Sequence, residues 1–139
     1  MKLIPSYRVS DNYGQGHYGA SRGSRTHKGQ DFKAFAGSTC LSDVCGKVTK
    51  FGYPYRKHLE YRYVQVTTDE GYDVRYFYIQ PLSNLNLGDN IKTDDEIGIV
   101  QDLELIYPNG MDNHIHFEVK KGGLHIDPLE FLKQLKEGA

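Results

Sequence analysis

Several features that define common protein classes are missing from this sequence of 139 residues. It contains no tryptophan, and no stretch approaches the roughly 20 apolar residues that a membrane-spanning helix requires. The formal net charge is −1, so no excess of positive charge is available to bind nucleic acid or an anionic membrane. The N-terminal residues lack the apolar segment of a signal peptide, which indicates a protein made without a secretion signal, or a processed or trimmed chain.

Cysteine is also scarce, with only Cys40 and Cys45. A structural zinc site usually needs four ligands, so this pair alone does not make one. The C-x-x-C spacing of redox enzymes is missing as well. Two interpretations stay open: two small buried thiols across a turn, or a local disulfide that closes the turn at residues 41–44 and would suit a protein working outside the cytoplasm.

Glycine and tyrosine are plentiful, with 15 and 11 residues, a composition typical of turn-rich β proteins. The length fits one domain with a core that needs no disulfides, so we predict a single domain over residues 1–139. Residues 1–26, rich in Gly, Ser, Tyr and Arg, are predicted to wrap this domain as a loop. Short apolar or alternating stretches predict strands over residues 31–36, 38–41, 46–51, 61–68, 72–79, 96–100 and 114–120.

Turn and cap residues predict the remaining boundaries. The run Asp-Glu-Gly at 69–71 predicts a hairpin between two of the strands, and the glycines at 122 and 123 predict another turn. Asp127 as N-cap, followed by Pro128, predicts a short C-terminal helix over residues 127–137. The predicted fold is mainly β: a single antiparallel β-sheet domain with a short C-terminal helix.

Two short runs carry candidate metal ligands. One contains His27 and Asp31, and the other contains His114 and His116 in an apolar segment predicted to be a central strand. Alternation along that strand places both imidazoles on one face. A solvated strand face would be the ordinary alternative, but the apolar neighbours and the earlier pair favour a metal site. Two imidazoles, one carboxylate and a position left for water are the composition of a catalytic zinc site.

These runs and several others, in their order along the chain, resemble the lysostaphin-type (LytM-like) zinc endopeptidases. The similarity covers about residues 13–132, in pieces at 18–22, 27–32, 36–39, 46–48, 87–92, 97–98, 114–119 and 126–129. Each piece is short, but their combination and order are specific. The resemblance implies a small β-sheet domain with a groove that holds one zinc ion, and hydrolysis of peptide bonds in bacterial peptidoglycan.

Residue by residue, the resemblance places His27, Asp31 and His116 on the family's metal ligands and His114 on a catalytic histidine. Arg22 falls on a position near the groove to which we assign no role. The chemistry agrees, because an imidazole with a pKa of about 6.5 can take a proton from a zinc-activated water and deliver it to the leaving amine. The alternative for His114 is to orient the water or a ligand from beside the metal.

The chain departs from the family at Tyr78. The family carries a second catalytic histidine in a Tyr-x-His-Leu pattern, and the corresponding run here is Tyr-Phe-Tyr-Ile at 76–79. A phenol with a pKa of about 10 is neutral near pH 7, so it can stabilise an oxyanion only as a hydrogen-bond donor. Tyr78 is therefore predicted to be a catalytic oxyanion donor. The alternative is a packed aromatic residue in an enzyme that has lost its activity.

The remaining histidines belong to no such motif. His17 and His58 lie in loop-like segments and are expected to be exposed, with the alternative that either reaches the groove. His125 is expected at the surface before the helix. Four tyrosines could form an exposed cluster that stacks on a glycan or peptide, although a packed sheet edge explains most of it. They are Tyr53, Tyr55, Tyr61 and Tyr63.

Together these predictions describe a zinc metalloendopeptidase that cuts peptide stems or cross-bridges of peptidoglycan and acts on the cell wall, in the periplasm or outside the cell. It is expected to be a monomer with one zinc ion that neither binds nucleic acid nor inserts into a membrane. Two alternatives stay open: a catalytically silent domain of the same fold that binds peptidoglycan or a partner protein, and a zinc peptidase with a protein substrate. A phage lysin, an effector delivered into competitors and a trimmed cell-wall enzyme would all fit.

Overall fold

The computed structural model of the protein describes residues 28–106 and 112–137 in full. Before them it describes only the backbone of four two-residue strands, which pair as β1 (Ser10–Asp11) with β2 (Gly14–Gln15) and β3 (Ser21–Arg22) with β4 (Arg25–Thr26). Two histidines of the sequence analysis, His17 and His27, lie outside the described residues. That residues 1–139 form one domain, wrapped by residues 1–26, stays a prediction.

The fully described residues form strands, one 3₁₀ helix and one α-helix. In chain order these are β5 (Gln30–Lys33), β6 (Thr39–Leu41), β7 (Gly46–Gly52), β8 (Tyr63–Thr67), β9 (Tyr72–Phe77), β10 (Ile79–Pro81), β11 (Asn90–Ile91), β12 (Glu96–Val100), η1 (Leu103–Leu105), β13 (His114–Lys121), β14 (Leu124–Ile126) and α1 (Pro128–Glu137). Each stretch predicted as a strand contains one with ends within a few residues of those expected, except that residues 72–79 are divided between β9 and β10. The short strands β11 and β14 were not predicted, because two or three residues are too few to show alternation.

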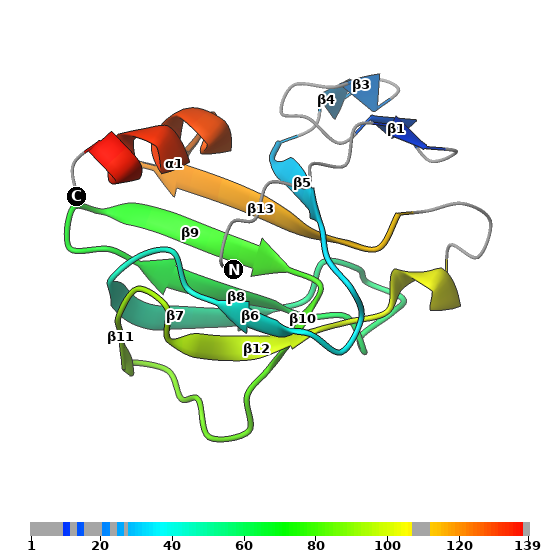
Figure 1. Cartoon of the computed structure of the whole chain (residues 1–139), viewed down its shortest axis with the longest axis horizontal. Coiled ribbons are helices and arrows are strands. Elements are labelled where there is room, and N and C mark those ends of the chain that lie inside the picture. The colour runs from blue at the N-terminus through cyan, green and yellow to red at the C-terminus, as the bar shows by residue number, and fades with distance from the viewer. Residues whose placement is uncertain are drawn as a thin grey trace.

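Strand β13 lies inside the larger sheet, with β9 along one edge and β5 along the other (Figure 1). The short β14 pairs with β13 on the same side as β5. The sheet continues from β9 through β8 and β7 to β11, and a smaller sheet has the order β10-β12-β6. All these pairings are antiparallel. The predicted fold class, mainly β and antiparallel with a short C-terminal helix, is therefore confirmed, although the strands are divided between sheets.

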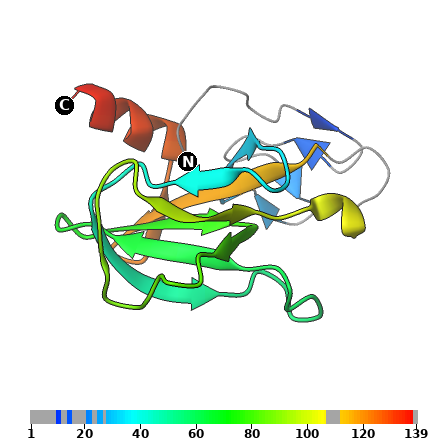
Figure 2. The same ribbon diagram turned by 60° about the horizontal axis from the view of Figure 1, so that its bottom comes forward.

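The two larger sheets share one hydrophobic core. Along β13, the alternate residues Ile115, Phe117 and Val119 point into it and are almost fully buried. The smaller sheet adds Cys40 and Ile97 to the same cluster, and Figure 2 shows this sheet lying over one face of the larger one. Burial of aliphatic and aromatic side chains of this kind contributes roughly 1.5–3 kcal/mol each. Because strand residues alternate, the even-numbered residues of β13 lie on the opposite face.

The division into two sheets begins at Tyr78. This residue has a φ of 70°, in the left-handed region that non-glycine residues rarely adopt. The chain bends there, and the next residue, Ile79, starts β10, which pairs with β12 instead of continuing beside β13. The prediction of one strand over residues 72–79 was wrong at this point, because alternation does not reveal a left-handed tyrosine.

The C-terminal helix α1 packs on the larger sheet through a few apolar side chains. The backbone N–H of Leu129 donates to the carboxylate of Asp127 at 3.0 Å, which is the predicted N-cap. Phe131 and Leu132 are buried, and the Phe131 ring contacts Tyr72 with ring centroids 4.9 Å apart. Neither this helix nor any other described helix is long and apolar enough to cross a membrane.

Both cysteines are free thiols. Cys40 is buried in the core and Cys45 is exposed, with its sulfur 3.6 Å from the Thr93 hydroxyl. The interpretation of two buried thiols is thus correct for Cys40 and wrong for Cys45. Burial raises the pKa of the Cys40 thiol to about 11, which keeps it protonated near neutral pH.

Candidate active site

The face of β13 that points away from the core carries three buried polar side chains. They are His114, His116 and Glu118, which are 4%, 9% and 8% exposed. Their alternate positions place them on one side of the strand, as the sequence pattern predicted for the two histidines. Burial of ionisable groups is costly unless they are hydrogen-bonded, so the partners of these three residues define the site.

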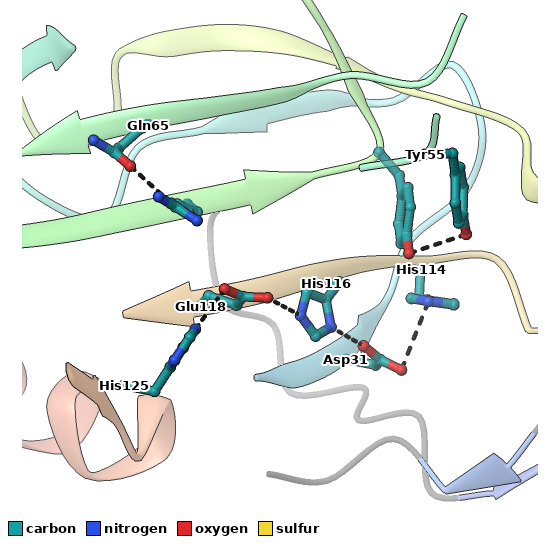
Figure 3. A network of polar contacts seen from close by, with 9 residues as sticks. Asp31, Tyr55, Gln65, His114, His116, Glu118 and His125 are labelled. Atoms are coloured by element: carbon teal, nitrogen blue, oxygen red, sulfur yellow. Dashed lines mark hydrogen bonds and ion pairs between the residues drawn. The ribbon is translucent and has the colours of Figure 1, made fainter. Parts of the chain in front are cut away.

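Strand β5 brings Asp31 to both histidines. It runs antiparallel to β13 in a register that pairs Asp31 with His116. One carboxylate oxygen lies 2.9 Å from His116 Nδ1, and the other lies 3.6 Å from His114 Nε2 (Figure 3). Asp31, which lies 85 positions before His116 in sequence, therefore meets both histidines on one face of the sheet. These are three of the four residues expected around the metal.

These donors are of the types that zinc binds. Asp31 offers a carboxylate and His116 an imidazole nitrogen, and the two groups already face each other. Within residues 28–106 and 112–137, no three His, Cys, Asp or Glu side chains are arranged to hold a metal by themselves. A zinc ion here would need a further ligand from outside this part of the chain, and His27, three positions before β5, is the predicted one.

Gly29 allows β5 to lie close to this imidazole. A Cβ atom added at Gly29 would lie 2.8 Å from His116 Nε2 and still closer to the carbonyl oxygen of Phe117. Real Cβ atoms do not make contacts this short, so only glycine fits between the two strands here without a shift of backbone. The glycine in the predicted run from His27 to Asp31 thus has a physical reason.

The backbone fixes the tautomer of His114. Its Nδ1 lies 2.7 Å from the carbonyl oxygen of Asp112, which can only accept a hydrogen bond. Nδ1 therefore carries the proton, and Nε2 is the nitrogen that faces Asp31. An imidazole held in this way presents its basic nitrogen to the place where the metal and substrate are expected.

Glu118 and His125 were not predicted as part of the site. Together with His116 and Asp31 they form a line of hydrogen-bonded side chains, here called the polar row. Glu118 accepts hydrogen bonds from His116 Nε2 at 2.8 Å and from His125 Nε2 at 2.9 Å, one at each carboxylate oxygen. His125 was expected at the surface, but its side chain is only 24% exposed because β14 folds it back onto Glu118. The alternation that places His114 and His116 on one face also includes Glu118, so this residue could have been found from the sequence.

Two carboxylates around one imidazole dominate the electrostatics of this row. Burial alone lowers the pKa of His116, but hydrogen bonds and charge attraction from Asp31 and Glu118 outweigh it and raise the pKa to about 9. Burial raises the pKa of Glu118, whereas its bonds to His116 and His125 lower it, and the net shift is downward. Before any metal binds, the row therefore holds His116 as an imidazolium between two anions.

Tyr78 lies beside His114. In an ordinary strand, Phe77 and the residue after it would point to opposite faces, but the left-handed backbone of Tyr78 lets both rings reach the histidines. Phe77 packs edge-on against His116 with centroids 5.0 Å apart, and Tyr78 packs edge-on against His114 at 5.5 Å. Tyr78 thus lies beside Asp31, His114 and His116, the other predicted site residues that the structure describes.

The hydroxyl of Tyr78 has a partner in Tyr55. The Tyr55 hydroxyl donates to it at 3.2 Å, and the two rings stack with centroids 5.9 Å apart (Figure 3). His58, which is partly exposed, packs edge-on against Tyr55 and lies 3.4 Å from Glu60. These contacts place an aromatic group next to the predicted catalytic residues.

Most of the four tyrosines considered as an exposed cluster are packed, as the favoured interpretation of a sheet edge expected. Tyr61 and Tyr63 are buried, at 1% and 6% exposed, and Tyr55 is partly buried. Only Tyr53 is an exposed tyrosine of this set, at 51%, and the Arg62 guanidinium covers its ring at 4.2 Å. The packed sheet edge, the ordinary alternative, explains Tyr61 and Tyr63.

Comparison with known proteins gives two matches by sequence. The family described as Peptidase family M23 matches residues 25–128. Leukocyte cell-derived chemotaxin-2 of Mus musculus is 32% identical over 111 residues, which cover 80% of this chain and 71% of that protein.

Solved structures give matches by fold. The antimicrobial peptidase lysostaphin from Staphylococcus simulans superposes with a TM-score of 0.66 and 22% identity, covering 94% of this chain and 52% of its own. A zinc-containing peptidase from Vibrio cholerae superposes with a TM-score of 0.60 and 22% identity, covering 87% of this chain and 36% of its own. The chain thus spans about half the length of lysostaphin. At 22% identity, the similarity to these two structures shows a shared fold only.

Proposed function

Since the chain belongs to peptidase family M23, we propose that it is a zinc-dependent endopeptidase that hydrolyses peptide bonds of bacterial peptidoglycan. The observation that carries this proposal is the meeting of Asp31, His114 and His116 on one buried face of β5 and β13. A domain that only needed to fold would gain nothing from burying two imidazoles and a carboxylate together.

In this proposal His27, Asp31 and His116 hold one zinc ion. Their donor types match those of catalytic zinc sites with two histidines and one carboxylate. When bound, a zinc ion supplies Lewis-acid chemistry, because it lowers the pKa of a bound water and polarises the carbonyl group to be cleaved. The zinc-containing peptidase with a similar fold supports this choice of metal.

His114 moves the proton. Its Nδ1 is bonded to the Asp112 carbonyl, so Nε2 accepts the proton of the attacking water and later delivers it to the leaving amine nitrogen. The 3.6 Å between His114 Nε2 and the Asp31 carboxylate puts this nitrogen beside a proposed ligand without making it one. This arrangement favours general base and acid over a purely orienting role.

Tyr78 supplies the second polar group. Its ring lies against His114, and its hydroxyl belongs to a pair with Tyr55. We assign to the Tyr78 hydroxyl the donation of a hydrogen bond to the substrate oxygen on which negative charge develops. The strained φ of this residue supports a functional role, because strained residues concentrate at active sites.

The substrate class rests on the resemblance of the sequence to the lysostaphin-type endopeptidases and on the likeness to the antimicrobial peptidase lysostaphin. Cutting the stems or cross-bridges of peptidoglycan places the site of action on the cell wall. The competing function is binding without cleavage, to peptidoglycan or to a partner protein. It is supported by Tyr78 standing where a histidine was expected, and by a mouse relative that is named a chemotaxin.

Two measurements test the proposal. Metal analysis of the purified protein should find about one zinc per chain, the number of a mononuclear site, and His116→Ala should remove it. Digestion of purified peptidoglycan, read by mass spectrometry, should yield new amino and carboxyl termini that disappear in His114→Ala while zinc is kept. The control is Lys133→Ala, which changes an exposed residue of α1 and should alter neither result.

The outcomes separate the candidates. A protein that binds no zinc would overturn the metal assignment. A protein that binds zinc but releases no new termini from several peptidoglycan types would favour the binding function.

A further inference from the structure

His116 is held at both ring nitrogens. Its Nδ1 lies 2.9 Å from Asp31 Oδ1, and its Nε2 lies 2.8 Å from Glu118 Oε2. The second oxygen of Glu118 lies 2.9 Å from His125 Nε2. Figure 3 shows the resulting row, in which His125, Glu118, His116 and Asp31 follow one another along β14, β13 and β5.

Glu118 has no direct part in the proposed reaction. Its two carboxylate oxygens are taken up by His116 and His125, so it is turned away from the Asp31 side of the His116 ring. It is nevertheless buried, at 8% exposed. Burial of a carboxylate costs free energy, so the position of Glu118 on a central strand indicates a role beyond packing.

The hydrogen bond to Glu118 selects the tautomer of His116. An ionised carboxylate only accepts, so in the metal-free protein both ring nitrogens of His116 donate, to Asp31 and to Glu118. When a metal takes Nδ1, the one proton that the ring keeps must sit on Nε2, where Glu118 accepts it. This leaves the lone pair on Nδ1, the nitrogen that faces Asp31. Histidines that bind metals commonly donate their other N–H to a carboxylate, which fixes both tautomer and ring orientation.

The hairpin of β13 and β14 aims His125 at Glu118. The two strands are joined by Gly122 and Gly123, both with positive φ, a turn that pairs Lys120 with His125. Glu118 lies two residues before Lys120 on the same face of β13, which makes it the diagonal neighbour of His125. The bond from His125 then holds the Glu118 carboxylate in place.

We infer that Glu118 and His125 are positioning residues for a metal ligand: His125 holds Glu118, and Glu118 holds His116 with Nδ1 directed to the side of Asp31. This inference rests on the proposed function, since it requires that His116 bind zinc. It assigns a role to two residues that touch neither substrate nor metal. The competing explanation is a purely structural role, in which Glu118 only satisfies the hydrogen-bonding nitrogens of His116 and His125.

The experiment measures zinc affinity by competition with a chelator, together with the thermal stability of the zinc-free protein. Glu118→Ala should weaken zinc binding by about 10- to 100-fold, the range found for such outer partners. Glu118→Gln should recover part of the loss, because an amide oxygen can still accept from Nε2 while the amide N–H₂ faces His125. His125→Ala should weaken binding by a smaller factor.

A matched control is Gln65→Ala. Gln65 accepts a hydrogen bond from Arg75 at 2.7 Å across neighbouring strands of the same sheet, but it does not contact His116. This variant should lose some stability and keep full zinc affinity. Long-range ¹H–¹⁵N NMR of the zinc-loaded protein adds a direct readout, in which His116 Nε2 should carry the proton in the wild type and in Glu118→Gln.

The results distinguish the inference from the proposed function. If the wild type binds no zinc, both are overturned. If it binds zinc but Glu118→Ala and His125→Ala bind it equally well, only the inference is overturned. If zinc affinity falls as expected while peptidoglycan is not cut, the inference stands and the hydrolytic function does not. Should Glu118→Ala fail to fold, Glu118→Gln and His125→Ala decide the question by the same affinity ratio.

Discussion

Tyr78 packs the edge of its ring against the imidazole of His114, with ring centroids 5.5 Å apart and ring planes at 87°. The contact depends on the left-handed backbone of Tyr78. In an extended strand, the Tyr78 side chain would point to the face opposite to that of Phe77, and so away from His114. Such a conformation costs a non-glycine residue roughly 1–3 kcal/mol and persists only where the surroundings enforce it. The left-handed backbone of Tyr78 thus accompanies the placement of its phenol beside His114.

The first prediction concerns the hydroxyl of Tyr78. Tyr78→Phe keeps the ring and removes the donor, so kcat for peptidoglycan cleavage should fall about 100- to 1,000-fold, the effect of losing one oxyanion donor. Zinc content should not change, because Tyr78 is no ligand. Tyr53→Phe is the control, since it removes an exposed phenol whose ring lies under Arg62. Equal rates for Tyr78→Phe and the wild type would assign this residue to packing.

A histidine at this position provides a complementary test. Histidine is among the residues that tolerate a left-handed backbone better than most, so Tyr78→His should fold. Its imidazole can be cationic near neutral pH, unlike the phenol. Activity should therefore persist and gain a dependence on pH between about 6 and 7, where an unperturbed imidazole titrates. A pH profile identical to that of the wild type would contradict this prediction.

The second prediction concerns Gly29. In Gly29→Ala the new Cβ atom would collide with the His116 imidazole and with the Phe117 carbonyl, so β5 and β13 must move apart. We expect a loss of roughly 1–3 kcal/mol in the free energy of unfolding, as for overpacked sites, and a loss of zinc binding. Urea denaturation and metal analysis measure the two effects.

Its control is Gly88→Ala. Gly88 has a φ of 88° and nothing within 4 Å of an added Cβ, so this variant adds backbone strain without a collision. It should lose roughly 1–2 kcal/mol of stability and keep its zinc. If Gly29→Ala also kept its zinc, the close approach of the two strands would not matter to the site.

The sequence predicted the strands well because their residues alternate. Ile115, Phe117 and Val119 had to share a face, and this placed His114 and His116 together on the other. The pairing of β5 with β13 that brings Asp31 to them could only be expected from the resemblance to a family, because the distance in sequence gives no register.

Local patterns could not reveal what depends on contacts across the fold. The partial burial of His125 follows from a hairpin that folds onto Glu118, not from its own neighbours in sequence. The bend at Tyr78 arises at a residue type that usually continues a strand. Tyr61 and Tyr63 look like a surface cluster in sequence, yet the sheet buries both.

The third prediction concerns the two thiols. Burial raises the pKa of Cys40 to about 11, whereas Cys45 is exposed. In the folded protein at pH 8, iodoacetamide should therefore label Cys45 and leave Cys40 unmodified, since only the thiolate reacts. Mass spectrometry of the labelled peptides measures the ratio, and unfolding in urea should make both thiols reactive. If neither thiol reacted after unfolding without a reductant, the pair would be a disulfide.

The fourth prediction concerns pH and the pair of Asp43 and Tyr76. The buried Tyr76 hydroxyl donates to Asp43 Oδ2 at 2.9 Å. Burial raises the pKa of Asp43 from its ordinary value of 3.8 to about 6, although the hydrogen bond from Tyr76 acts to lower it. The folded protein thus binds a proton at Asp43 more tightly than the unfolded chain does, and the contribution of this group to stability falls as the pH rises from about 4 to about 6.

Asp43→Asn removes that titration while keeping an oxygen that accepts from Tyr76. Urea denaturation at several pH values between 4 and 7 should show a difference in stability that moves in favour of the variant as the pH rises. Glu118 has a lowered pKa and contributes in the opposite direction, but it is present in both proteins and cancels in the difference. A difference that stays constant over this range would show that Asp43 titrates normally.

The last prediction concerns Asn113, which precedes His114. Its side-chain N–H₂ donates to the carbonyl oxygens of Ala34 at 2.8 Å and Gln101 at 3.0 Å, and its oxygen accepts from the N–H of Leu103 at 2.7 Å. One amide therefore ties the end of β5, the end of β12 and the start of η1 to His114, the first residue of β13. Leu103 is fully buried, so no water can replace the partner of its N–H.

Asn113→Ala should lower the free energy of unfolding by about 2–4 kcal/mol, because it leaves buried groups without hydrogen bonds. Asn113→Asp should be worse than alanine near neutral pH, since a carboxylate satisfies Leu103 but faces two carbonyl oxygens that need donors. Asn84→Ala, in an exposed turn, is the control and should change stability little. Urea denaturation gives all three values. Equal stability of the alanine and aspartate variants would mean that Asn113 acts by filling space, whereas the order expected here requires its two donated hydrogen bonds.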